Sequence, residues 1–133
     1  MTGCGRGVTN GARWTLPNRL ESVPAARSVL HLLLRGWSLA PDVVDAAALL
    51  VTELATNAVR HGCGDLVVNM TEGDGLIRVS VHDDASAQPC QGTAAADDDE
   101  GGRGLSLVDA VSLRWGTRAA PVGKDVWFEL AHP

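Results

Sequence analysis

Residues 40–82 read APDVVDAAALLVTELATNAVRHGCGDLVVNMTEGDGLIRVSVH, and this stretch decides the fold. From Ala40 to His61 the apolar residues recur at the three-and-four spacing of a helix that buries one side, with a proline in the first turn and Gly62 after the last. Two segments rich in branched apolar residues follow, 65–71 and 76–82, and a turn sequence rich in glycine separates them. The stretch therefore predicts a long helix followed by an antiparallel hairpin.

The flanking sequence adds further elements of both kinds. Residues 12–16 alternate as an edge strand does before a proline, and residues 23–36 have helical spacing. A short helix is predicted over 104–111, and two strands over 112–117 and 125–130. This order predicts an α+β fold, a two-layer sandwich whose mixed, mostly antiparallel sheet is covered on one face by about three helices.

The chain of 133 residues has the length of a single domain. We expect residues 1–11, which are rich in glycine, to form a flexible leader, and residues 12–133 to form the domain. Residues 85–102 combine small residues, a proline and an acidic run, and they show no period. A segment of this length without structure predicts a mobile loop that covers a ligand as a lid.

Composition excludes several classes of function. The net charge is −5 and the sequence has no cluster of Lys and Arg, which argues against direct binding to nucleic acid. No apolar stretch is long enough for a bilayer span, and the N-terminus does not resemble a signal peptide. The cysteines Cys4, Cys63 and Cys90 have the spacing of neither a disulfide framework nor a zinc site. We therefore expect a cytoplasmic protein in a reducing compartment, away from membranes.

Three polar residues of the long helix are spaced by four. Glu53, Asn57 and His61 project from nearly one stripe, beside the apolar stripe that contains Leu54 and Ala58. A polar group buried there without a partner costs about 1–3 kcal/mol, and a complex of metal ion and phosphate would supply the partners. The simpler interpretation is that Glu53, Asn57 and Arg60 lie at a helix edge and face water.

The second strand of the hairpin ends in two carboxylates. Alternation places Asp83 on the same face as the apolar Val79 and Val81, where the amino group of a purine would be a suitable partner. A local bulge would instead turn Asp84 inward. Both aspartates also suit a turn that ends the strand, and a metal site formed with His82 is the less favoured alternative.

A glycine-rich turn, Gly101-Gly-Arg-Gly104, separates the long loop from the short helix. Backbone N–H groups at such a turn and at a helix N-terminus bind phosphate oxygens, and Arg103 would add positive charge. The alternative is a hinge before the helix.

Taken together, these motifs resemble the N, G1 and G2 boxes of the histidine-kinase-like ATPase superfamily. The resemblance rests on Glu53-Leu-Ala-Thr-Asn57-Ala-Val-Arg-His61, on Val79-Ser-Val-His-Asp83 and on the segment from Gly101 to Val108, which occur in the family's order. The closing segment from Gly123 to Leu130, and the lack of a dimerisation segment with a phospho-acceptor histidine, resemble the short anti-sigma-factor serine kinases of actinobacteria. The resemblance implies a Bergerat fold, in which ATP lies between the sheet and a lid.

The resemblance also implies roles for single residues. Asn57 would coordinate Mg²⁺ at the phosphates, and Glu53 would act as general base on a serine hydroxyl of a protein substrate. Asp83, or Asp84 if the register differs, would accept a hydrogen bond from the adenine amino group. Ala85 stands where relatives have Ser or Gly. The residues implied at the phosphates are Arg60, His61, Gly102, Arg103, Gly104 and Leu105.

The function expected from this resemblance is that of an ATP-binding regulator. It would be an anti-sigma-factor-type serine/threonine protein kinase that uses ATP and Mg²⁺ to phosphorylate an anti-sigma-factor antagonist. The alternative is a non-catalytic, nucleotide-responsive module that sequesters a sigma factor or another regulator. A structural domain without a nucleotide site would require three motifs to fall in family order by accident. Relatives often dimerise, so a homodimer is compatible with the resemblance.

Overall fold

The computed structural model describes residues 7–85 and 107–133 of the chain. A short helical segment at 107–111 precedes the fourth strand. The seven longer elements are β1 (Asn10–Leu16), α1 (Ser22–Gly36), α2 (Pro41–His61), β2 (Leu66–Gly73), β3 (Leu76–Asp83), β4 (Arg114–Ala119) and β5 (Lys124–Ala131).

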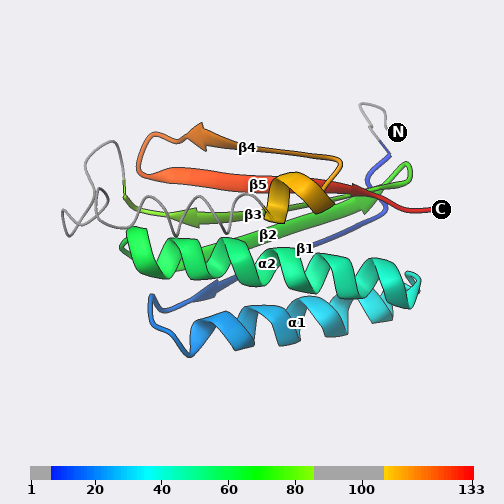
Figure 1. The fold of residues 1–133 in the computed structure, drawn as a ribbon, viewed down its shortest axis with the longest axis horizontal. Helices are drawn as coiled ribbons and strands as arrows, with labels where there is room; N and C mark the ends of the chain where they lie inside the picture. The colour runs from blue at the N-terminus through cyan, green and yellow to red at the C-terminus, as the bar shows by residue number, and fades with distance from the viewer. Residues whose placement is uncertain (1–6, 86–106) are drawn as a thin grey trace.

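The five strands form one sheet in the order β1-β2-β3-β5-β4, so the last strand lies between β3 and β4 (Figure 1). All four pairings within the described residues are antiparallel. The expected α+β sandwich with a mostly antiparallel sheet is confirmed, and the described strands include no parallel pair.

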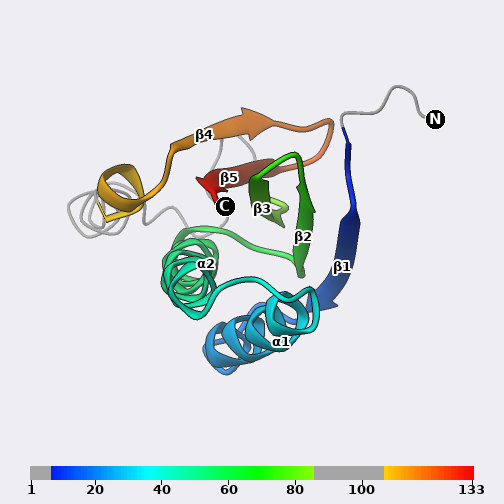
Figure 2. The same ribbon diagram turned by 90° about the vertical axis from the view of Figure 1, so that its right-hand side faces the viewer.

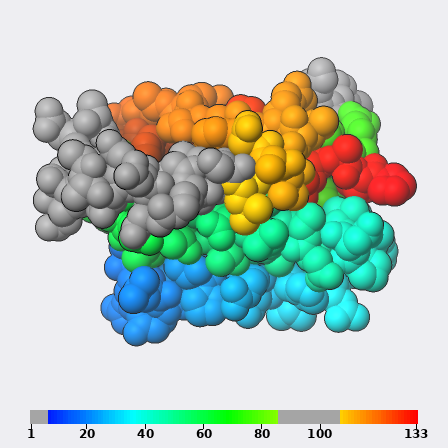
Figure 3. Space-filling view, viewed as in Figure 1, coloured from blue at the N-terminus to red at the C-terminus, as the bar shows by residue number. Residues whose placement is uncertain are grey.

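Both long helices lie on the same face of the sheet, which leaves the other face uncovered by them (Figure 2). The strands alternate accordingly, as in β3, where every second residue from Ile77 to Asp83 is buried. In the space-filling view the segment 107–111, in yellow, lies at the surface between α2 and β4 (Figure 3). Its Val108 is fully buried in the core. None of the helices in the described part of the chain combines the length and the apolar character that a membrane span needs.

The core lies between the helix layer and the sheet, and its members are the apolar residues that the helical and alternating patterns place inward. The largest buried side chains are those of Phe128, Leu30, Leu34, Leu50, Leu54, Leu66, Met70 and Ile77. Burial of side chains of this size contributes about 1.5–3 kcal/mol each, relative to exposure. This packing holds α2 firmly against β3 and β5.

Several element boundaries differ by one or two residues from the sequence-based expectation, and two of these differences have a visible cause. The pairing of β1 with β2 begins at Asn10, whose side chain donates to Glu72 Oε1 at 2.7 Å, so the sheet takes in residues that were expected in the leader. In addition, β4 begins at Arg114 rather than at Ser112. The backbone N–H and the hydroxyl of Ser112 both donate to the carbonyl of Val108, so helical bonding continues to Ser112 and delays the start of the strand. Of the expected lid at residues 85–102, only Ala85 lies within the described residues.

Candidate functional site

The long helix α2 carries the polar residues of the first motif. Leu54 and Ala58 are buried, which turns Glu53 and Asn57 to the partly buried edge of the helix. A spacing of four residues separates them by about 6 Å along the helix axis. Within residues 7–85 and 107–133 neither side chain makes a hydrogen bond or an ion pair, so their oxygen atoms are available to a ligand.

The last turn of α2 is basic. It contains Arg60, which is exposed, and His61, which is partly buried. Cationic side chains at a helix C-terminus are favoured by the partial negative charge of the last carbonyl groups. Their expected place beside the phosphates stays a prediction.

The two carboxylates at the end of β3 have opposite environments. Asp83 is 1% exposed and faces the helices, as the alternation predicts, whereas the side chain of Asp84 is 48% exposed. The backbone N–H of Asp84 donates to the carbonyl of Cys63 at 2.7 Å, which fixes the strand end against the loop after α2. Asp83 is therefore the carboxylate that lies inside the fold.

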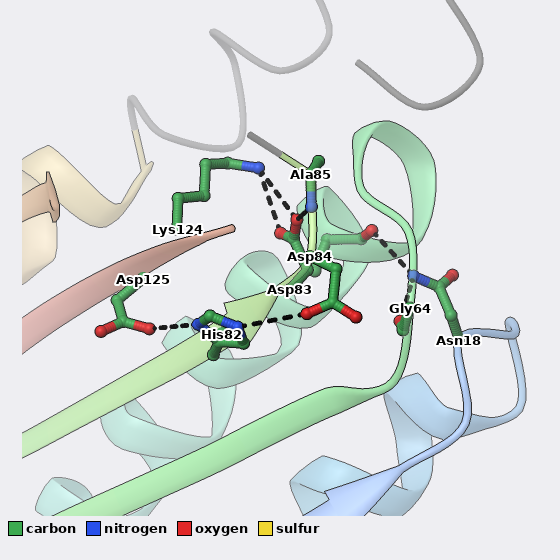
Figure 4. Close-up of polar contacts among 9 residues, drawn as sticks. Asn18, Gly64, His82, Asp83, Asp84, Ala85, Lys124 and Asp125 are labelled. Atoms are coloured by element: carbon green, nitrogen blue, oxygen red, sulfur yellow. Dashed lines mark hydrogen bonds and ion pairs between the residues drawn. The ribbon is translucent and has the colours of Figure 1, made fainter. Parts of the chain in front are cut away.

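A residue that the sequence analysis did not single out completes this part of the site. Lys124, the first residue of β5, is the register partner of Asp83, and its Nζ lies 3.2 Å from Asp83 Oδ1 and 3.1 Å from Oδ2 (Figure 4). Oδ1 also accepts a hydrogen bond from the N–H of Ala85 at 2.8 Å. A charged residue at the start of an apolar strand was the available signal, but its partner depends on the pairing of β3 with β5.

Glycines allow the backbone to close around Asp83. A β-carbon on Gly62 would lie 2.5 Å from Asp83 Cγ, and one on Gly123 would overlap the carbonyl oxygen of Asp83. Gly123 has a φ of +78°, in the left-handed region that favours glycine. From the other side Asn18, also missed in the sequence, donates to the carbonyl of Gly64 at 3.1 Å (Figure 4). These contacts hold the α2–β2 loop against the end of β3.

His82 lies on the opposite face of the sheet from Asp83. Its Nδ1 is 2.8 Å from Asp125 Oδ1 and its Nε2 is 3.4 Å from Asp84 Oδ1 (Figure 4). His82 and Asp83 therefore do not share a ligand. No group of three His, Cys, Asp or Glu side chains in the described ranges is arranged to hold a metal ion.

One cysteine corrects an expectation. Cys63, in the loop after α2, is disulfide-bonded, although the cysteine spacing predicted no disulfide. Spacing along the chain does not determine which sulfur atoms lie close in space, and this is the physical reason for the error. The expectation of a reducing compartment rested on the absence of a disulfide, so the cysteines no longer support it. The other cysteines, Cys4 and Cys90, lie outside the described residues.

The structure thus brings together the end of α2, the loop that follows it and the first residue of β5, around the buried Asp83. Glu53 and Asn57 extend from this point along α2. The phosphate-binding residues expected from the glycine-rich turn are Gly102, Arg103, Gly104 and Leu105, and all four lie outside the described residues.

The chain was compared with solved structures, with curated proteins and with protein-family models. A solved structure described as the RsbU and RsbW domains of Rv1364c from Mycobacterium tuberculosis superposes with a TM-score of 0.73 at 18% identity. The match covers 93% of this chain and 33% of that one, so the chain spans about a third of its length and the likeness concerns the fold. A search among curated proteins finds no match. The family model for the histidine kinase-like ATPase domain matches residues 16–130, nearly the whole chain. The chain therefore belongs to the histidine kinase-like ATPase domain family, a membership that implies ATP binding.

Proposed function

We propose that this domain is an anti-sigma-factor-type serine/threonine protein kinase, which binds ATP with Mg²⁺ and phosphorylates an anti-sigma-factor antagonist. The observation that carries the proposal is that Glu53 and Asn57 lie on one edge of α2 without partners among the described residues, while the helix ends against the buried Asp83. The fold similarity to a structure that includes an RsbW domain supports the same assignment.

The residues present suit a nucleotide with its metal ion. Asn57 offers an amide oxygen, a ligand type that Mg²⁺ accepts while it keeps several water molecules. Asp83, which lies beside Gly62 at the end of α2, offers an acceptor position for the amino group of adenine. When bound, Mg²⁺ would neutralise charge on the phosphates. The nucleotide would then lie along α2, with its base at Asp83 and its phosphates toward Asn57.

Glu53 would take part in the transfer itself. As the oxygen of a substrate hydroxyl forms its bond to the γ-phosphorus, the bond from that phosphorus to the β–γ bridging oxygen breaks and ADP leaves. The hydroxyl proton passes to the Glu53 carboxylate. Phosphoryl transfer depends mainly on positioning and on charge neutralisation, so a small domain is sufficient for it.

The test is transfer of labelled phosphate from ATP to a panel of anti-sigma-factor antagonists. Glu53→Gln should slow transfer by about 10²–10⁴-fold, the usual contribution of a general base, and should leave ATP affinity near that of the wild type. Glu21→Gln, at an exposed position before α1, is the matched control. If wild-type protein binds ATP and captures an antagonist or a sigma factor without any transfer, the domain is a non-catalytic binding module and the kinase assignment is wrong.

A further inference from the structure

The buried carboxylate of the candidate site is already half of an ion pair. Asp83 is 1% exposed and Lys124 is 25% exposed, and the ammonium lies within 3.2 Å of both carboxylate oxygens. The β3–β5 register and the tight turn at Gly123 fix the backbone of Lys124 opposite Asp83. Lys124 is also the only lysine in the sequence. A ligand that reaches Asp83 therefore meets Lys124 as well.

The pair should stay intact when a ligand binds. Loss of one partner from a buried ion pair leaves the other charge uncompensated, and this is strongly unfavourable. A carboxylate has about four acceptor positions, and Asp83 uses them for two contacts with Lys124 and one with the N–H of Ala85. An acceptor position on Oδ2 remains. An ammonium group has about three N–H donors, so Lys124 also keeps one donor in reserve.

The pair thus presents an acceptor and a donor side by side. A lone carboxylate would suit only the donor edge of a base and would repel a carbonyl oxygen. Adenine offers its 6-amino group as donor with ring nitrogens as acceptors beside it. Hypoxanthine and guanine offer the reverse order, an O6 acceptor beside the N1–H donor. Both kinds of purine edge are complementary to an adjacent acceptor and donor.

We propose that Asp83 and Lys124 together read the purine base, so that the site accepts 6-oxopurine nucleoside triphosphates as well as ATP. In the 6-oxopurine complex Lys124 donates to O6 and Asp83 accepts from N1–H. In the ATP complex Asp83 accepts from the 6-amino group. This inference rests on the proposed nucleotide site.

The first experiment uses wild-type protein and compares ATP with ITP by calorimetry in the presence of Mg²⁺. ITP is chosen because hypoxanthine lacks the 2-amino group of guanine and so isolates the change at position 6. The inference predicts that ITP binds within about threefold of ATP, whereas loss of a hydrogen bond to a charged group would weaken it by about 10–150-fold. ATP binding with such a loss for ITP overturns the inference and leaves the proposed function standing. If neither nucleotide binds, the proposed function fails and the inference with it.

The second experiment uses the lysine itself. An amine-reactive acylating reagent followed by mass spectrometry reports on Lys124 alone among the side chains. ATP and ITP should both slow its acylation, whereas tripolyphosphate, which has no base, should not. Equal protection by tripolyphosphate would show that Lys124 contacts phosphate and would contradict its assignment to the base.

A variant then separates the two nucleotides. Lys124→Met should lower affinity for ITP by at least about tenfold more than affinity for ATP, because only O6 requires the ammonium as donor. Lys124→Arg retains the charge and the donors and should keep the wild-type ratio. Circular dichroism checks that each variant is folded. If Lys124→Met does not fold, the calorimetric comparison of ATP with ITP on the wild-type protein still tests the inference. Equal losses for ATP and ITP in folded Lys124→Met would refute the role in base selection.

Discussion

Gly62 lies against the buried Asp83 so closely that a β-carbon on it would be 2.5 Å from Asp83 Cγ and 2.7 Å from the carbonyl oxygen of Ala58. The carbonyl belongs to the backbone of α2, and the carboxylate is held by Lys124 and Ala85. Neither neighbour can move without loss of other contacts. The end of α2 can therefore meet the end of β3 only because residue 62 has no side chain.

Gly62→Ala should lower the free energy of unfolding by about 1–3 kcal/mol, the usual cost of added volume in a packed region. It should also weaken ATP binding, because Asp83 must shift. The matched control is Gly36→Ala, since a β-carbon there meets nothing within 4 Å. It should be neutral or slightly stabilising. Urea unfolding measures both variants, and a Gly62→Ala protein as stable as the wild type would contradict the close packing.

The two-layer core can be tested with one substitution at two positions of α1. Leu30 is fully buried against the core, whereas Leu32 is 73% exposed. Leu30→Ala should cost about 2–5 kcal/mol because it leaves a cavity, and Leu32→Ala should change stability by no more than about 0.5 kcal/mol. Thermal unfolding followed by circular dichroism would show the difference. Similar losses in both variants would mean that α1 packs through a different face.

Glu129 links two arginines on the outer face of the sheet. Arg78 Nη1 lies 3.1 Å from Glu129 Oε2 and the guanidinium stacks 4.1 Å from the centre of the Trp127 ring. Arg114 approaches Glu129 Oε1 at 2.6 Å, but its side chain is 62% exposed. We expect Arg78→Ala to cost about 1–2 kcal/mol, from the ion pair and the stacking together.

Arg114→Ala is the comparison for that prediction. Solvent screens an exposed ion pair, so the loss should be about 0–1 kcal/mol and should shrink as salt is added. Urea unfolding at low and high ionic strength measures both effects. If Arg114→Ala lowers the free energy of unfolding more than Arg78→Ala does, the stacking on Trp127 contributes little and the predicted ranking of the two variants is wrong.

The sequence predicts the regular elements well, because periodicity reflects local burial. The alternation of β3 placed Asp83 inward and Asp84 outward, and both are found so. The start of β4 was wrong by two residues because Ser112 bonds back to Val108 and prolongs the helical segment. Such a local side-chain bond leaves no periodic signal.

The contacts of the site were harder to predict than its elements. Lys124 reaches Asp83 only because β5 inserts between β3 and β4, and the order of strands is a long-range property. The hydrogen bond from Asn18 to the carbonyl of Gly64, in the loop after α2, is also a long-range contact, because 46 positions separate the two residues in the sequence. The disulfide of Cys63 likewise depends on distance in space and not on spacing along the chain.

The central claim, that α2 and Asp83 form an ATP site, is tested most directly by calorimetric titration of ATP with Mg²⁺ into wild type, Asn57→Ala and Asn69→Ala. Asn69 is exposed on the outer face of β2 and provides the same substitution away from the site. The account predicts saturable binding by wild type and Asn69→Ala, and binding weaker by about 10–100-fold in folded Asn57→Ala. Removal of Mg²⁺ should weaken the wild type to a similar degree. Absence of binding by folded wild type, or equal affinity in Asn57→Ala, would contradict it.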